Sequence, residues 1–399
     1  MFDVMEIRKQ FPVLSGNSVP VYLDSACMAM KPEVVLSAMD EYYRTFPACG
    51  GRSVHRFGEK VERKVSETRQ KVSRFIGAKN KDEIIFTRNT TEGINLLVNS
   101  FPFVEGDVVV TTDKEHNSNL IPWQLLARKK RIVHKIIKRK DDGTFDMDAL
   151  GRVLKEGRVR MLALTHTSNW DGEAIPAKEI SKLAKQYGAL LFLDVAQTLP
   201  HKKVNVQSLD ADFLAGSGHK MYGPTGTGFL YGKEEHLRTL APFMVGGGTV
   251  ADVSPETHVL LPPPACFEAG LQDYAGILGL GAAVDFLQSF DMAEVSEHEE
   301  SLARKLRAGL SAFEGVRLFG DGSGSIVSFT HNKFEPERVA VMLEEVGGIM
   351  VRSGRHCVHL FAERMGLPKG TVRASFAMYN TEAEVNTFVA TMDKIVSLT

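Results

Sequence analysis

Short apolar runs alternate with longer amphipathic stretches between about residues 21 and 235. Several of these runs are continuously apolar, which is typical of strands buried on both faces of a sheet. The stretches between them have helical periodicity, as in 180–187, where Gly188 follows at the usual position of a helix stop. This alternation predicts an α/β fold with a mostly parallel sheet covered on both faces. The expected strands lie at 83–87, 107–110, 161–164, 189–193, 213–215 and 228–231.

The pattern changes after residue 246, where turn-forming residues gather as far as residue 264, with three consecutive glycines and three consecutive prolines. A helical stretch then runs from 270 to about 309, and further strands are expected near 325–329 and 347–351. We therefore predict a large α/β domain at 15–285 and a smaller C-terminal α+β domain at 286–399. The N-terminal segment 1–14 is expected to join the smaller domain.

Composition narrows the class of protein. The chain has 399 residues, of which 43% are hydrophobic and 24% charged, and its net charge of -1 does not favour nucleic acid or an anionic membrane as partner. The sequence lacks an apolar run of the roughly 18 residues that a membrane span needs, and its first residues lack the apolar core of a signal peptide. We expect a cytoplasmic protein.

Four cysteines stand at positions 27, 49, 266 and 357, without a CxxC pair or a His/Cys cluster at metal spacing. Neither a disulfide framework nor a metal site is expected. Each cysteine is at first interpreted as a small buried apolar residue.

Polar side chains follow several of the expected strands. Asp194 ends one run and Gln197 follows it, His116 lies past the strand near residue 110, and Lys220 follows the run 213–215. Taken singly, each could be a helix cap or a solvated group. In open parallel sheets, however, ligands bind beyond the carboxyl ends of the strands.

These groups together match the needs of pyridoxal 5′-phosphate (PLP). That cofactor requires a lysine for covalent attachment, an acid beside its ring nitrogen and an anion site for its phosphate. Lys220 and Asp194 supply the first two. Residues 89–95, which include Thr90 and Thr91, predict a helix N-terminus with hydroxyl groups after the strand at 83–87, which is a natural phosphate site.

The sequence also resembles a known family, the cysteine desulfurases, in the spacing of its group II (SufS) branch. The resemblance covers about residues 20–395. It implies a PLP-dependent transferase fold of type I with a seven-stranded sheet, a homodimer, L-cysteine as substrate and a sulfur-acceptor protein as partner. The matching segments are 22–26, 90–95, 115–116, 168–169, 194–197, 217–220, 222–226, 352–357 and 373–380.

The resemblance also implies roles for single residues. Lys220 binds the cofactor covalently and moves the substrate's α-proton, while His116 stacks on the ring. The expected contacts to the rest of the cofactor come from Asp194, Gln197, Thr90, Thr91, Ser217, His219 and Asn169. The expected contacts to the substrate come from Asn169, Arg373, Arg352, His55 and Arg56, although His55 and Arg56 could equally be an exposed pair at a helix start.

Cys357 is the expected sulfur acceptor. It completes the motif Arg-x-Gly-x-x-Cys through Arg352 and Gly354. The neighbouring Arg352, Arg355 and His356 are expected to form a cationic setting that favours the thiolate, which is the nucleophilic form. In the resulting reaction, Cys357 takes the sulfur of L-cysteine as a persulfide and L-alanine is released, for iron–sulfur cluster assembly or another sulfur-transfer pathway.

Some positions differ from the family pattern. Leu271 stands where the family has a threonine that reaches the partner subunit's cofactor phosphate, and Cys266 stands where it has an arginine. The alternatives are a selenocysteine lyase, or an epimerase or lyase of the same class acting on another amino acid, or a non-catalytic scaffold. A scaffold would not need Lys220, Asp194 and His116 together.

Overall fold

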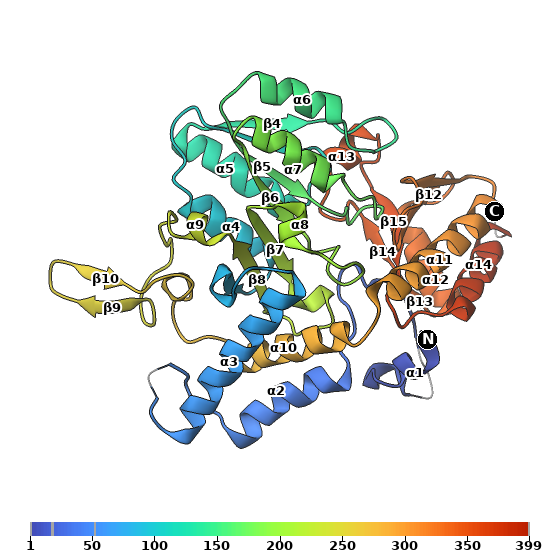
Figure 1. Ribbon diagram of the computed structural model, residues 1–399. Helices are drawn as coiled ribbons and strands as arrows, with labels where there is room; N and C mark the ends of the chain where they lie inside the picture. The colour runs from blue at the N-terminus through green and yellow to red at the C-terminus, as the bar shows by residue number, and fades with distance from the viewer. Residues whose placement is uncertain (1, 17–19, 52, 398–399) are drawn as a thin grey trace.

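The computed structural model describes residues 2–16, 20–51 and 53–397. Its centre is a seven-stranded sheet of order β2-β8-β7-β6-β5-β3-β4, in which only β8 runs antiparallel to its neighbours (Figure 1). The predicted mostly parallel sheet is therefore confirmed. The strands are β2 (Ile84–Thr87), β8 (Gly228–Gly232), β7 (Phe213–Ser217), β6 (Leu190–Asp194), β5 (Val159–Thr165), β3 (Val108–Thr112) and β4 (Val133–Ile137).

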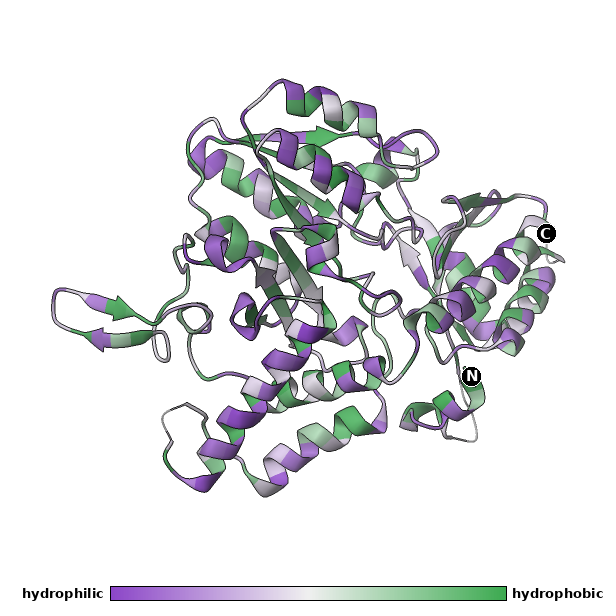
Figure 2. Cartoon of the chain, viewed as in Figure 1, coloured by the Kyte–Doolittle hydropathy of each residue, from purple (hydrophilic) through white to green (hydrophobic). Residues whose placement is uncertain are grey.

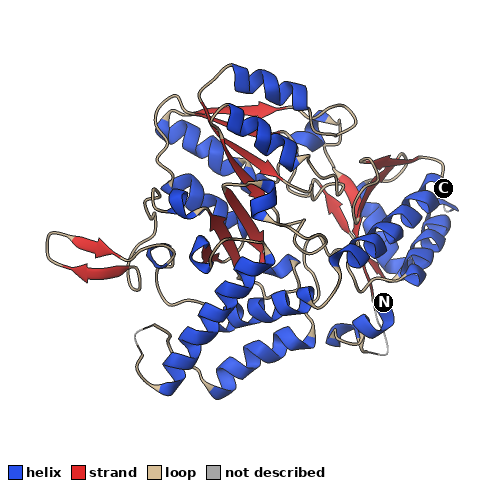
Figure 3. Ribbon diagram, in the orientation of Figure 1, coloured by secondary structure: helices blue, strands red, loops and turns tan. Residues whose placement is uncertain are grey.

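Consecutive residues of the central strands face opposite cores. In β6, Leu191 and Leu193 belong to one buried cluster, whereas Phe192 belongs to the other. A strand buried on both sides needs apolar residues at every position, which explains the continuous runs in the sequence. Figure 2 shows these mostly apolar strands between helices that carry both polar and apolar residues, and Figure 3 shows the strands and the helices around them by type.

Different helices cover the two faces. The first face packs on α3 (Arg56–Phe75), α6 (Met147–Lys155), α7 (Ala177–Gln186) and α10 (Tyr274–Gln288). The second packs on α4 (Thr90–Ser100), α5 (Ile121–Lys130) and the short α9 (Glu234–Leu237). The short α8 (Val206–Leu209) joins the first face, and α2 (Glu33–Thr45) packs against α10.

The C-terminal part forms a second layered body. A four-stranded antiparallel sheet has the order β11 (Val316–Phe319), β12 (Ile326–His331), β15 (Thr371–Ser375) and β14 (Arg352–Gly354). Its core lies against α11 (Met292–Ser311), α12 (Pro336–Gly347) and α14 (Glu382–Ser397). The chain therefore has a large sheet domain and a smaller C-terminal domain, while the division between 285 and 286 stays a proposal.

The N-terminal segment bridges these two bodies. After α1 (Val4–Arg8), Phe11 packs edge-on against Phe286 and Tyr379, and Arg8 pairs with Glu384 of α14 at 2.9 Å. Further along, β1 (Val21–Tyr22) pairs in parallel with β13 (Ile349–Met350) of the smaller domain. Ala26 and Cys27, which follow β1, line the pocket described below.

Three predictions of local structure were wrong or incomplete. The helix expected from 270 to about 309 is two helices, because Asp291 accepts a hydrogen bond from the Ala293 amide and starts α11 anew. The turn region 246–264 contains a projecting hairpin of β9 (Val250–Val253) and β10 (His258–Leu260). The strand β4 was missed, since only its last residue is buried and its sequence is not a continuous apolar run.

Candidate active site

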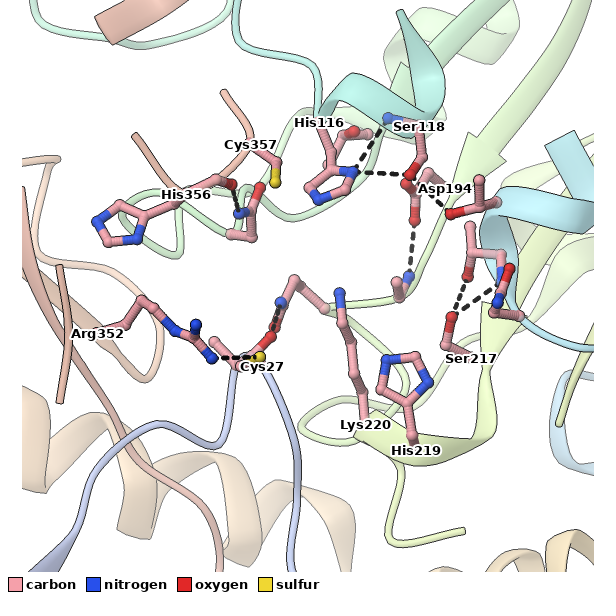
Figure 4. Close-up of a pocket in the computed structure, with 18 of the residues that line it drawn as sticks. Cys27, His116, Ser118, Asp194, Ser217, His219, Lys220, Arg352, His356 and Cys357 are labelled. Atoms are coloured by element: carbon pink, nitrogen blue, oxygen red, sulfur yellow. Dashed lines mark hydrogen bonds between the residues drawn. The ribbon is translucent and has the colours of Figure 1, made fainter. Parts of the chain in front are cut away.

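A pocket of about 290 Å³ lies at the carboxyl ends of the parallel strands, where segments from both domains meet (Figure 4). The structure brings most of the predicted site residues together around it. Those that line it are Thr90, Thr91, His116, Asn169, Asp194, Gln197, Ser217, His219, Lys220, Arg352, Cys357 and Arg373.

One end of the pocket is the N-terminus of α4, where Thr90 and Thr91 occupy the first turn. The Thr90 amide donates to Ser217 Oγ at 2.9 Å, and the Thr90 and Ser217 hydroxyls lie 2.7 Å apart. Gly93 lets the helix approach the sheet, because a Cβ there would lie 3.2 Å from Ala215 Cβ. The free amides of a helix N-terminus, joined by hydroxyl groups, suit a phosphate.

Asp194 is the last residue of β6 and is 5% exposed. Burial raises the pKa of its carboxyl, while Lys220 and the Ala196 amide act in the opposite direction. A buried carboxylate is stabilised when a cation is placed beside it. A protonated ring nitrogen at this position would provide that charge.

Lys220 ends a short 3-10 turn that follows β7 (Phe213–Ser217), and its side chain reaches into the pocket (Figure 4). Burial lowers the pKa of its amine, the Asp194 charge raises it, and Arg373 lowers it further. A lowered pKa increases the share of neutral amine, which is the form that can attach to a carbonyl.

His116 follows β3 and caps the 3-10 turn Asn117–Asn119. Its Nδ1 accepts a hydrogen bond from the Ser118 amide at 3.1 Å, which places the proton of the neutral ring on Nε2. Burial, with smaller contributions from Lys220 and Arg373, lowers its pKa to about 3. The ring is therefore uncharged at neutral pH and can lie flat on an aromatic cofactor.

Several buried polar atoms at the pocket have no partner within the described chain. They are Thr165 Oγ1, Asn169 Oδ1, Gln197 Oε1, His356 Nδ1 and Arg373 Nε. Buried polar groups are normally hydrogen-bonded, so such atoms indicate a polar ligand. Together with the α4 N-terminus, Asp194 and Lys220, they fit PLP and an amino acid bound beside it.

Arg373 is 3% exposed, and its guanidinium is held by the protein at two points. It donates from Nη2 to Asp24 Oδ1 at 3.0 Å and from Nη1 to the Asn169 carbonyl at 3.0 Å. The unpartnered Nε remains for a ligand. Because an arginine fork binds a carboxylate through parallel hydrogen bonds, this end of the pocket suits the carboxylate of a substrate.

Cys357 lies on an exposed turn between β14 and α13 (His359–Arg364). Both His356 and Cys357 have left-handed backbone angles, with φ of 49° and 58°. Such angles are uncommon outside glycine and need support from surrounding contacts. The Asn117 amide donates to the Cys357 carbonyl at 2.7 Å, and Asn169 Nδ2 donates to the His356 carbonyl at 2.7 Å.

The expected cationic setting of Cys357 was wrong in its details. The half-buried His356 ring has its Nε2 2.9 Å from Thr371 Oγ1, and desolvation with Arg373 nearby lowers its pKa to about 2, so it is neutral. Arg355 donates from Nε to the Pro368 carbonyl. Arg352 reaches Asp24 and Cys27. Lys220 lines the same pocket as Cys357, and the Cys357 charge is one of the smaller influences that raise the pKa of the Lys220 amine.

Two of the predicted residues lie elsewhere. His55 is exposed and caps α3, where its Nδ1 accepts a hydrogen bond from the Gly58 amide at 3.2 Å. Arg56 is also exposed, and its guanidinium lies over the Phe57 ring. Neither lines the pocket of its own chain. Their role in substrate binding stays a prediction.

Some residues at or beside the pocket were missed by reasoning from the sequence. Cys27, expected to be structural, lines the pocket, as does Ser118, while Asp24 bridges Arg352 and Arg373. The available signals were that Asp24 lies within the segment 22–26, that Cys27 follows it directly and that Ser118 lies two residues after His116.

No helix in the described parts of the chain is long and apolar enough to cross a membrane. Over the same residues, no group of three or more histidine, cysteine or acidic side chains could hold a metal ion.

Comparisons with known proteins show the family to which the chain belongs. Residues 21–388 match the family model described as aminotransferase class-V. A probable cysteine desulfurase of Methanothermobacter thermautotrophicus is 38% identical over 98% of both chains. The apo structure of a cysteine desulfurase from Thermococcus onnurineus is 37% identical, with a TM-score of 0.94 over 99% of this chain and 98% of that one. The cysteine desulfurase CsdA of Escherichia coli is 32% identical, with a TM-score of 0.93 over 100% and 99%.

Proposed function

Because this chain belongs to the class-V aminotransferase family and is a PLP-dependent cysteine desulfurase, we propose that it converts L-cysteine to L-alanine and holds the released sulfur on Cys357. The observation that carries the assignment of Cys357 is its position. It is an exposed thiol at the rim of the pocket that also holds Lys220 and Arg373.

PLP supplies a ring that accepts electrons from the substrate's α-carbon when it is bound. The chain's own residues position the reactants. Arg373, fixed by Asp24 and the Asn169 carbonyl, holds the substrate carboxylate through its remaining donors. Lys220 Nζ takes the proton from the α-carbon. The neutral His116 lines the pocket and would stack on the ring of the bound cofactor.

Cys357 then receives the sulfur. Its thiolate attacks the sulfur of the substrate, so that an S–S bond forms and the bond between Cβ and sulfur breaks. The electron pair of the broken bond stays with the carbon, which is protonated to give alanine. The turn that carries Cys357 is supported by Asn117 and Asn169, which keeps the thiol at the mouth of the pocket.

We further propose a homodimer and a protein sulfur acceptor. Support for the dimer comes from apolar side chains left exposed beside one another in the single chain. Phe243, Met244 and Leu271 line one pocket and are 47%, 43% and 74% exposed. Clustered exposed apolar residues mark interaction surfaces. All four cysteines are free, as expected in a reducing compartment, which supports a cytoplasmic location.

The test is to incubate the purified holoprotein with L-cysteine and to measure alanine and the persulfide on Cys357 together. Cys357→Ser should bind PLP and form no persulfide at that position, whereas the control Cys49→Ser should match the wild type. Alanine release at the wild-type rate from Cys357→Ser would refute the assignment. A parallel reaction with selenocysteine separates a desulfurase from a selenocysteine lyase.

A further inference from the structure

The pocket contains a second thiol. Cys27 follows the strand β1 and is partly buried, and it lines the same pocket as Cys357 (Figure 4). The other two cysteines are placed differently. Cys266 is buried in the core beneath the main sheet, and Cys49 is exposed without lining the pocket.

Arg352 contacts Cys27. The sequence motif had led us to expect Arg352 beside Cys357 instead. Arg352 Nη2 donates to Cys27 Sγ at 2.8 Å, and its Nε donates to Asp24 Oδ2 at 3.1 Å. Arg352 belongs to β14, the strand that leads into the turn of Cys357. The segment that carries Cys357 is therefore already in contact with the second thiol.

Lys220 connects the two sulfurs electrostatically. The charges of Cys27 and of Cys357 both raise the pKa of the Lys220 amine, so both sulfurs lie within range of the same group. The reaction takes place beside this amine, which means that a sulfur delivered there has two thiols near it.

The polar groups around Cys27 also point to an anionic ligand. Arg373 Nε is buried and has no partner in the described chain, and Asp24 holds Arg373 and Arg352 side by side. While substrate is bound, its carboxylate occupies this end. Once alanine has left, these arginines can balance the negative charge of a persulfide on Cys27.

We propose that Cys27 is a second sulfur-carrying residue, which takes the persulfide sulfur from Cys357. The proposal rests on the desulfurase function given above. The Cys27 thiolate attacks the terminal sulfur of the Cys357 persulfide. A new S–S bond forms on Cys27, the S–S bond on Cys357 breaks, and its electron pair leaves with Cys357 Sγ as a thiolate. The step needs no oxidant or reductant, and it frees Cys357 for a second substrate.

The experiment measures alanine in the burst phase and maps the sulfur. The holoprotein is mixed with excess L-cysteine without a reductant, quenched with an alkylating agent and digested for mass spectrometry. Wild-type protein should release about two alanine molecules per chain in the burst, with persulfide on the peptides of both Cys27 and Cys357. Cys27→Ser should release about one, with sulfur on Cys357 alone.

Two further variants complete the test. Cys49→Ser should behave like the wild type, and Cys357→Ser should leave Cys27 without sulfur, because Cys27 receives it only from Cys357. The PLP absorption band shows whether Cys27→Ser folds. If it does not fold, the positions of sulfur in the wild-type protein still test the proposal.

Each other outcome overturns the relay. These outcomes are sulfur on Cys357 alone, a longer polysulfide chain on Cys357, sulfur on Cys27 in Cys357→Ser, or a disulfide between Cys27 and Cys357 with release of sulfide. The absence of both alanine and Cys357 persulfide would instead refute the proposed function.

Discussion

Replacing Arg373 by lysine tests whether this side chain holds the substrate carboxylate. One Nη group of the guanidinium donates a hydrogen bond to Asp24 and the other donates to the Asn169 carbonyl, both at 3.0 Å. The Nε hydrogen and the second hydrogen on each Nη remain for a ligand. Lysine keeps the positive charge but has a single nitrogen, which cannot reach all three partners at once.

The substitution should remove at least one hydrogen bond between charged groups. Such a bond contributes about 1.5–3 kcal/mol net, which corresponds to a roughly ten- to hundredfold change in a binding constant. We therefore expect the KM for L-cysteine to rise by about that factor in Arg373→Lys. The kcat should change less if the contact is equally strong in the bound substrate and in the transition state.

The assay is alanine formation at varied L-cysteine concentrations, together with the absorption spectrum of bound PLP. An unchanged spectrum would show that the cofactor site is intact. Arg355→Lys is the matched control, because Arg355 lies on the turn of Cys357 but does not line the pocket. It should leave KM at the wild-type value.

A KM for Arg373→Lys within about twofold of the wild type would refute the reasoning, because a change that small is less than the loss of one charged hydrogen bond. The carboxylate would then bind elsewhere. A large fall in kcat with unchanged KM would also contradict it, since that result places the role of Arg373 in the chemical step.

Three other changes test the remaining parts of the site. Asp194→Asn should lower kcat by roughly a hundredfold while PLP stays bound, because a neutral amide cannot form an ion pair with a protonated ring nitrogen. Wild-type turnover would contradict that pairing. Burial lowers the pKa of His116, His166 and His356 to about 3, 4 and 2, so the unfolded chain binds their protons first as the pH falls below about 6.5. Above that pH the three neutral rings contribute their full stabilisation. On acidification the free energy of unfolding falls by about 1.4 kcal/mol per pH unit for each ring, so the midpoint of urea unfolding should fall between about pH 7 and pH 5. A constant midpoint would refute this. Leu271→Thr should tighten PLP binding to the apo-protein by roughly tenfold if this exposed residue reaches a partner's phosphate site, and unchanged affinity would show that it does not.

The positions of the main site residues were predictable from local patterns. Asp194 and Lys220 follow apolar runs, and Thr90 begins a helix that Asn89 caps, with Asn89 Oδ1 accepting from the Glu92 amide at 2.9 Å. Strand and helix periods depend on neighbouring residues, and the carboxyl ends of parallel strands meet at one edge of a sheet. These two rules were enough to place the residues in one pocket. The same rules failed for β4, whose mixed sequence and exposed positions lack a clear period.

The contacts between residues far apart in the chain were decided only by the tertiary structure. Arg352 stands near Cys357 in the sequence, yet its guanidinium binds Asp24 and Cys27, more than three hundred residues away. His356 was expected to be a cation, but packing against Thr371 and nearby Arg373 keeps it neutral. Residue type and spacing specify which groups can react, because they are properties of the chain itself. The charge of a group and its partners depend on which distant segments exclude water from it, and that is settled only when the two domains pack together.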